Sequence, residues 1–368
     1  MELTPEDLLR LNVLLANQIQ AIRIDESKMI LYGLSERGDA KIQLHPNCRD
    51  ERYLQLVREA IADHIKEASG VYPAYIGYWH QMVPDHDKLA QWLMFGEPDA
   101  VLSVVHTPGL SLELARRAWW AMPSTGNALC LLEKKAILQS EFAKELAQYL
   151  LESLPFEEDN NNLIESVHRI LKAGVIEEET RMKMWNRGRT KSAYWVGFLK
   201  AQPDNLPEPL PQRVDAEQIK TALSPLVAQN NQIAKQLIRT TSSAGQTFLN
   251  TCEQVLRKPS TQGVVNSLFE IIADYFSDIR PTRDDKMDMP SLIARVNSLD
   301  KSPEQQSVLT KMPAMEKTIR AMFLLSGLGD SVLRPIFLKT TAIGSLMRKK
   351  LKPITDPIFE ELGILQKK

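Results

Sequence analysis

The sequence contains very little cysteine. Cys48, Cys130 and Cys252 are the only three, one in each third of the 368 residues, and no two of them form a CxxC pair. This distribution excludes a disulfide framework and the paired cysteine spacing of structural zinc sites. It is typical of a protein from a reducing compartment, so we expect a cytoplasmic location.

Long apolar runs and an excess of charge are also missing. The richest apolar stretch, AMFLLSGLG at 321–329, is far shorter than the roughly 18–20 residues that a membrane-spanning helix needs. The formal net charge of −1 gives the chain no overall attraction to nucleic acid or to anionic membranes. We therefore expect no membrane insertion, and any anionic partner would have to meet a local patch.

Motifs of nucleotide and metal chemistry are missing too. The stretches SGLGDS at 326–331 and SSAGQT at 242–247 do not show the strand-loop-helix context or the Lys-Ser/Thr ending of a phosphate loop, and no GxSxG occurs. His80 and His86 stand near Asp85 and Asp87, but Pro84 breaks any shared helical face. We expect no metal and no cofactor, and catalysis stays uncertain, with a non-enzymatic role favoured.

The apolar pattern predicts a mostly α protein that begins with a small α+β domain at residues 1–72. The segments QAIRID, KMILYGLS and DAKIQLHP are enriched in alternating apolar residues, and the short stretches DES and ERGD separate them. Alternation with turn-like connections is typical of a short antiparallel sheet. Thr4 and Pro5 indicate a helix start before this sheet.

The remaining residues are predicted to be helical. The segment 127–138 repeats the apolar pattern of 99–110, each is followed by a second helical segment, and a looser third copy starts at His168. Recurring helix pairs predict a solenoid-like domain at 73–202 that resembles HEAT-like and leucine-rich repeat variant families. Prolines predict a linker at 203–213, and a C-terminal helical bundle is expected at 214–368.

The stretch ARRAWWAMP at 115–123 places two tryptophans behind two arginines. At about 100° per residue, Trp119 falls on the apolar half of its helix, whereas Trp120 falls on the polar half between Arg116 and Arg117. We predict that Trp119 is a core residue and that Arg116, Arg117 and Trp120 bind a protein partner. The alternative is that Trp120 packs against the next pair of helices.

A second candidate surface is the basic stretch 181–200, which contains no acidic residue and includes Trp185, Tyr194 and Trp195. Its candidate nucleic-acid contacts are Arg181, Lys183, Arg187, Arg189 and Lys191. Cations neutralise phosphates and rings stack on bases, so this composition fits single-stranded RNA. Alternatively, the aromatic rings are core residues, and the basic residues lie near a helix C-terminus, where they favour the negative end of the helix dipole.

Two weaker candidates remain. The stretch 331–355 carries six basic residues and no acid, and we favour a solvated helix end over contact with membrane phosphates or RNA. Cys48 is followed by Arg49 near an expected helix start, which makes it a candidate reactive thiol. Cys130 lies in the apolar segment ALCLL and is expected to be inert.

Two segments resemble a known family: LRLNVLLANQIQAIRIDESKMILYGLSERGDAKIQLHPNCRD and GEPDAVLSVVHTPGLSLELARRAWWAMP. They are similar to the DsrS family of accessory proteins, which are encoded with dissimilatory sulfite reductase genes in sulfur-oxidising bacteria. The resemblance implies a cytoplasmic accessory or regulatory role in dissimilatory sulfur oxidation and implies no cofactor. It carries no catalytic motif.

Three functions follow from these observations. The first is a non-enzymatic helical adaptor for a protein partner, and the second is an RNA-binding regulator that uses 181–200. The third is a sulfur carrier that uses Cys48.

Overall fold

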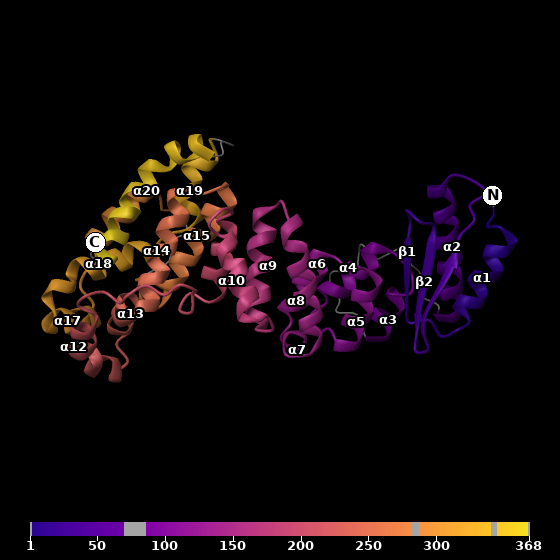
Figure 1. Cartoon of the computed structure of the whole chain (residues 1–368), viewed down its shortest axis with the longest axis horizontal. Coiled ribbons are helices and arrows are strands. Elements are labelled where there is room, and N and C mark those ends of the chain that lie inside the picture. The colour runs from indigo at the N-terminus through magenta and orange to yellow at the C-terminus, as the bar shows by residue number, and fades with distance from the viewer. Residues whose placement is uncertain (1, 70–85, 282–286, 340–343, 367–368) are drawn as a thin grey trace. The chain divides into compact units, whose positions relative to one another are not determined.

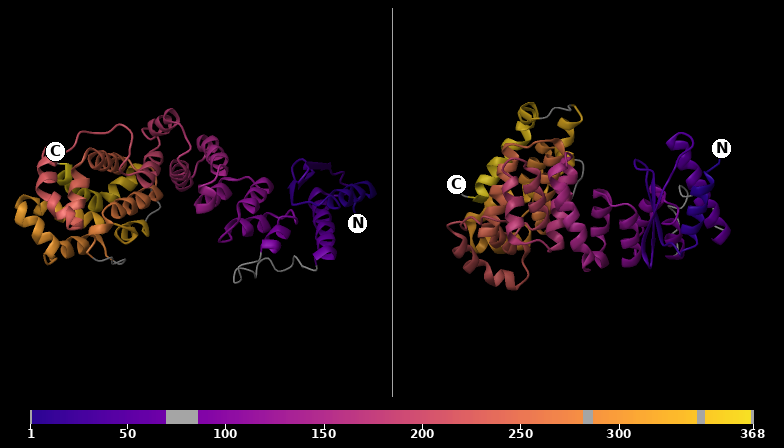
Figure 2. Two further views of the ribbon diagram at one scale, coloured as in Figure 1. Left: turned by 90° about the horizontal axis from the view of Figure 1, so that it is seen from below. Right: turned by 45° about the vertical axis from the view of Figure 1, so that its right-hand side comes forward.

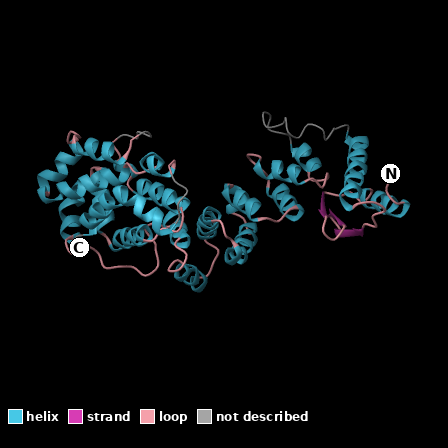
Figure 3. Ribbon diagram, turned by 90° about the horizontal axis from the view of Figure 1, so that it is seen from above, coloured by secondary structure: helices cyan, strands magenta, loops and turns pink. Residues whose placement is uncertain are grey.

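The computed structural model describes residues 2–69, 86–281, 287–339 and 344–366. Here the chain is mostly α-helical with one three-stranded antiparallel sheet near its N-terminus, which confirms the predicted fold class (Figure 3). The contacts divide the chain into two compact units, Met1–Ser153 and Leu154–Lys368, and the finer boundaries expected from the sequence stay predictions. None of the helices in these ranges has both the length and the apolar composition that crossing a bilayer requires.

The first unit begins with helix α1 (Pro5–Leu15), as Thr4 and Pro5 predict. The Thr4 side chain accepts a hydrogen bond from the backbone N–H of Asp7 and caps the helix. Asp7 itself is buried, and its carboxylate accepts hydrogen bonds from the Tyr53 hydroxyl at 2.6 Å and from the His45 backbone N–H at 2.6 Å. Burial raises the pKa of Asp7, but these hydrogen bonds lower it by more, so the net pKa lies below its ordinary value.

Three strands follow in the order β1 (Ala21–Asp25), β2 (Ile30–Ser35) and β3 (Gly38–Gln43), and helix α2 (Asp50–Ser69) comes next. Arg23 lies opposite Tyr32, and Leu34 lies opposite Asp39. Because side chains alternate along a strand, these four residues share one face of the sheet. On the other face, a Cβ atom on Gly33 would lie 3.0 Å from Ile19, so glycine allows the close packing there.

Short helices complete the first unit, and helices lie on both faces of the sheet (Figures 1 and 2). They are α3 (His86–Trp92), α4 (Pro98–His106), α5 (Leu112–Ala121), α6 (Thr125–Glu133), α7 (Lys135–Leu138) and α8 (Phe142–Ser153). The backbone N–H of Ile22 in β1 donates to the carbonyl of Leu93, so the loop after α3 covers the edge of the sheet. The prediction that these helices form HEAT-like repeats stays a prediction.

Every regular element that the structure describes in the second unit is a helix. Its α-helices are α9 (Asn160–Ala173), α10 (Glu178–Arg187), α11 (Ala193–Ala201), α12 (Ala216–Ala228), α13 (Gln232–Thr241), α14 (Ser243–Arg257), α15 (Gln262–Tyr275), α16 (Met289–Asn297), α17 (Pro303–Lys311), α18 (Glu316–Ser326), α19 (Asp330–Phe337) and α20 (Gly344–Gln366). Single 3₁₀ turns occur at Leu154–Phe156, Ser277–Ile279 and Pro313–Met315. Helices α9 and α11 pack closely because Gly197 leaves room for Val167, whose side chain would lie 2.6 Å from an added Cβ.

The proline-rich segment 203–213 makes specific contacts inside the second unit. Leu206 is buried, and the backbone N–H of Leu210 donates to the Thr247 hydroxyl at 2.9 Å. Arg213 is also buried, where it pairs with Asp215 at 2.6 Å and donates to the carbonyl of Leu365. These contacts hold the segment against α14 and the end of α20.

The half-buried imidazole of His168 in α9 makes the stability of the second unit depend on pH. Burial and, to a smaller extent, the nearby cations of Lys200 and Arg169 together lower the pKa of His168 to about 4. A folded-state pKa below the unfolded value of 6.5 means that the unfolded chain binds the proton more tightly, so stability is lost as the pH falls from 6.5 towards 4.

We therefore expect the free energy of unfolding to fall by about 1–2 kcal/mol between about pH 7 and pH 4.5 because of this group, allowing for its partial exposure. Urea unfolding at both pH values measures the change. His168→Gln should remove this part of the pH dependence, whereas His106→Gln, at an exposed histidine, should retain it. An equal pH dependence in wild type and His168→Gln would contradict the prediction.

Candidate partner-binding site

Helix α5 separates the two tryptophans as the helical period predicts. Trp119 is 7% exposed, its ring meets Tyr149 edge-on at 4.8 Å, and its indole N–H donates to Glu145 at 2.9 Å. Tyr149 and Glu145 both belong to α8, so Trp119 joins α5 to α8. The prediction that Trp119 is a core residue is confirmed.

Trp120 points instead towards the sheet. Its indole N–H donates to the Asp39 carboxylate at 3.0 Å, and the Arg23 guanidinium lies 5.0 Å from the centre of its ring. Arg23 also lies 4.5 Å from the centre of the Tyr32 ring and donates to the backbone carbonyl of Trp120 at 3.4 Å. Trp120 is therefore held against the sheet by residues of β1 and β3.

The two arginines of α5 have different partners. Arg117 is mostly buried and forms an ion pair with Glu113, one turn earlier in the same helix. Arg116 is exposed, and its guanidinium lies 5.6 Å from the centre of the Phe142 ring. No carboxylate in the described part of the chain pairs with Arg116, so its charge faces solvent.

These residues line an open pocket of about 590 Å³ on the first unit. Its lining consists of Gln20, Leu34, Leu112, Glu113, Arg116, Arg117 and Trp120. The two leucines and the indole ring supply apolar walls, and Arg116 supplies a positive charge. The structure thus brings all three sequence-predicted residues, Arg116, Arg117 and Trp120, to one pocket.

The pocket residues that come from the sheet could not be predicted from the local sequence. Gln20 and Leu34 precede α5 by many residues. Asp39 lies beside the turn between β2 and β3, where an aspartate is common and indicates no particular role. The alternation of the strands places Leu34, Tyr32 and Asp39 on one face, but it does not say which helix covers that face. Only the tertiary structure identifies these residues as part of the site.

The basic stretch 181–200 lies on the second unit, and its rings are mainly internal. Trp185 and Tyr194 are each 4% exposed. The Trp185 indole donates to Glu208 at 3.1 Å, and the Trp195 indole donates to the carbonyl of Trp185 at 3.0 Å. Rings in this arrangement pack with each other and with Phe198, and they offer little face for stacking on bases.

The five candidate nucleic-acid contacts also have partners within the second unit. Arg181 donates to Glu178 at 2.9 Å, Lys183 to Glu179 at 2.6 Å, Arg187 to the Tyr194 hydroxyl at 3.4 Å, Arg189 to Glu208 at 2.7 Å and Lys191 to the carbonyl of Glu157 at 2.7 Å. The acids that neutralise this stretch lie before and after it in the sequence. RNA binding by 181–200 stays a prediction without support from this geometry.

The cysteines do not form a cluster. Cys48 is half-buried in the connection between β3 and α2, where its thiol lies 3.7 Å from the carbonyl of Arg49. Cys130 lies 3.6 Å from Nδ1 of the exposed His106, and Cys252 is fully buried, which raises the pKa of its thiol well above the ordinary value. The contact between Cys130 and His106 could not be predicted from the sequence, because the two residues lie on different helices.

Metal-ligating side chains show no gathering in the described ranges, where no group of three or more His, Cys, Asp or Glu residues could hold an ion. His86 faces Asp87 at 3.8 Å and Ser111 at 3.4 Å. His80 and Asp85 lie outside the described residues.

Comparisons with family models, with curated proteins and with solved structures found no match to this chain. We therefore infer function from the geometry of the chain and from the resemblance of its sequence.

The two tryptophans should differ in their effect on stability. Trp119→Ala removes a large buried ring and should lower the free energy of unfolding by about 3–5 kcal/mol. Trp120→Phe keeps a ring against Arg23 and loses the hydrogen bond to Asp39, which should cost about 1 kcal/mol. Denaturant unfolding of both variants measures the difference, and equal losses would show that Trp120 is a core residue like Trp119.

Proposed function

We propose that this chain is a non-enzymatic accessory protein of dissimilatory sulfur oxidation that binds a protein partner through the pocket beside Trp120. The observation that carries the proposal is the pocket itself, in which an exposed cation stands beside a fixed aromatic ring. Tryptophan and arginine are the residues that most often dominate binding energy at protein interfaces. The resemblance to the DsrS family supports the pathway and a cytoplasmic location.

The fixed position of Trp120 favours binding. Its ring is held by the hydrogen bond to Asp39 and by Arg23, so a partner need not immobilise it on association. A preorganised surface loses less conformational entropy when it binds and therefore retains more of its contact energy. Leu34 and Leu112 beside the ring provide apolar surface for an anchoring side chain.

The charges of the pocket define the chemistry of the partner. Glu113 is neutralised by Arg117, whereas Arg116 has a cation exposed to solvent. The matching segment carries an apolar side chain for the leucines and the indole, with a carboxylate close by for Arg116. Such a pairing gives both affinity and orientation, because the carboxylate has a single cation to meet.

The lining favours binding over catalysis. It includes no serine, cysteine or histidine among its described residues, and its one carboxylate, Glu113, is paired with Arg117. A general base or nucleophile needs an available side chain of these types. The RNA-binding regulator and the Cys48 sulfur carrier are the alternatives, and persulfide labelling with intact-mass analysis tests the second of these.

The partner is identified by photocrosslinking in cells growing on reduced sulfur. A photoreactive amino acid replaces Gln20 at the rim of the pocket, and a matched sample carries it at Lys144, an exposed position on α8 outside the pocket. We expect a protein adduct from position 20 that is missing from position 144. The same adduct from both positions, or none from position 20, would remove the pocket as the binding surface.

The affinity for the purified partner then tests the role of the Arg116 charge. Arg116→Glu should weaken binding of the purified partner by about 30-fold, which corresponds to a hot spot of about 2 kcal/mol. Lys144→Glu makes the same change of charge at a residue that is paired with Glu141 away from the pocket, and it should leave the dissociation constant within about twofold. Equal dissociation constants for the two variants would contradict the proposal.

A further inference from the structure

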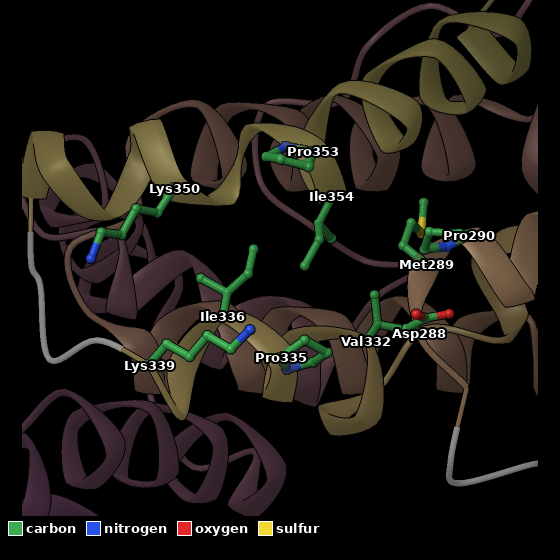
Figure 4. A pocket seen from close by; sticks show the side chains of 10 residues that line it. All are labelled: Asp288, Met289, Pro290, Val332, Pro335, Ile336, Lys339, Lys350, Pro353 and Ile354. Carbon is green, nitrogen blue, oxygen red and sulfur yellow. The ribbon is translucent and has the colours of Figure 1, made fainter.

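The second unit contains an apolar groove of about 500 Å³ that is distinct from the pocket on the first unit. It lies between α19, α20 and the start of α16 (Figure 4). Its lining consists of Asp288, Met289, Pro290, Val332, Pro335, Ile336, Lys339, Lys350, Pro353 and Ile354. Met289, Val332 and Ile354 are buried and form its floor, so the groove is apolar at depth.

Proline stiffens the walls of this groove. Pro290 lies in the first turn of α16, and Pro335 and Pro353 lie inside α19 and α20. Each proline ring fixes its φ angle and presents an apolar surface without a backbone N–H donor. The groove is therefore shaped in advance for a hydrocarbon group and offers it few hydrogen-bond donors from these walls.

Positive charge lies at one end of the groove. Figure 4 shows Lys339 and Lys350 towards one end, on opposite walls, and Asp288 towards the other. Exposed Arg348, Lys349 and Lys352 extend the cationic surface along α20. Within the described ranges, no ion pair joins Lys339, Arg348, Lys349 or Lys352 to a carboxylate.

Two large apolar side chains stand exposed beside these cations. Leu338, next to Lys339, is 80% exposed, and Leu346, in the first turns of α20, is 54% exposed. Leucines beside lysines and arginines are typical of surfaces that lie in the interfacial layer of a membrane, where cations meet phosphates and apolar side chains reach the acyl region. The sequence alone favoured a solvated helix end, because the groove is not visible in it.

We propose that this surface binds the anionic phospholipids of a membrane, with an acyl chain in the groove and the headgroup phosphate on Lys339 and Lys350. Leu338 and Leu346 enter the interfacial layer beside the bound lipid. The protein associates with the membrane surface, and none of its described helices is long and apolar enough to span the bilayer.

The lining of the groove favours a lipid over a nucleic acid. Sequence-tolerant binding of single strands depends on aromatic rings that stack on bases, and none of the described residues that line this groove is aromatic. An acyl chain needs an apolar groove with a cationic end, and this combination is present. The proposal does not depend on the partner proposed for the first unit.

Vesicle co-sedimentation of the full chain tests the proposal. We expect binding to phosphatidylcholine vesicles that contain about 30% phosphatidylglycerol, little binding to pure phosphatidylcholine, and loss of binding at high salt. Lys339→Glu/Lys349→Glu should weaken binding at least tenfold, because each cation near an anionic surface contributes about 1 kcal/mol. Lys220→Glu/Lys258→Glu, two exposed lysines of α12 and the end of α14, should bind like wild type.

The exposed leucine has its own matched control. Leu338→Ser should weaken vesicle binding several-fold, whereas Val214→Ser, at a fully exposed apolar residue of the same unit, should not. Because both side chains are exposed, unfolding experiments should give wild-type stability for each variant. Equal vesicle binding by Leu338→Ser and wild type would overturn the role of the leucine and the membrane proposal with it.

Photolabelling of the wild-type protein measures whether an acyl chain occupies the groove. Phosphatidylglycerol with a photoactivatable group in its acyl chain should label residues within 289–290, 332–339 or 350–354 when vesicles are irradiated. Labelling confined to other peptides, equal binding to neutral and anionic vesicles, or retention by single-stranded RNA without vesicle binding would each overturn the proposal.

Discussion

The first unit depends on one cation held between two rings. Arg23 lies over Tyr32 within the sheet and over Trp120 from α5, and it also donates to the Trp120 carbonyl. A guanidinium stacked between rings fixes their separation and their orientation, because its plane and its charge both contribute to the contact. The hydrogen bond from the Trp120 indole N–H to Asp39 also fixes this ring. The pocket beside Trp120 exists because the sheet and α5 meet in this arrangement.

Much of the fold could be predicted, because it is encoded by short-range periodicity. Apolar residues that alternate predicted the three strands, and the 100° step of the helix separated Trp119 from Trp120. These patterns state which face of an element is apolar. They do not state which element covers that face, so the contact of Trp120 with β1 and β3 could not be predicted from the sequence, and neither could Gln20 and Leu34 as lining of the pocket.

The basic stretch 181–200 shows the same limit for charge. Its local composition is cationic, yet Glu178 and Glu179 precede it, and Glu208 returns to it from the segment after α11. The composition of a short stretch includes its own cations, but it does not include the acidic residues from elsewhere in the sequence that the fold places beside them. The aromatic residues are misread for a similar reason, since Trp185 and Tyr194 stabilise the packing of α10 and α11 and are scarcely exposed.

The stretch 331–355 has a similar composition and the opposite environment. Asp330 pairs with Arg334 at 3.5 Å, but in the described ranges the fold brings no carboxylate to Lys339, Arg348, Lys349 or Lys352. Unpaired cations repel one another, and binding of an external anion reduces this repulsion. The same surface also exposes apolar groups, namely the side chain of Leu338 and the groove between α19 and α20. Two stretches that look alike in sequence therefore differ in their surroundings: the cations of the first have polar partners within their own unit, and we propose an anionic lipid as the partner of the second.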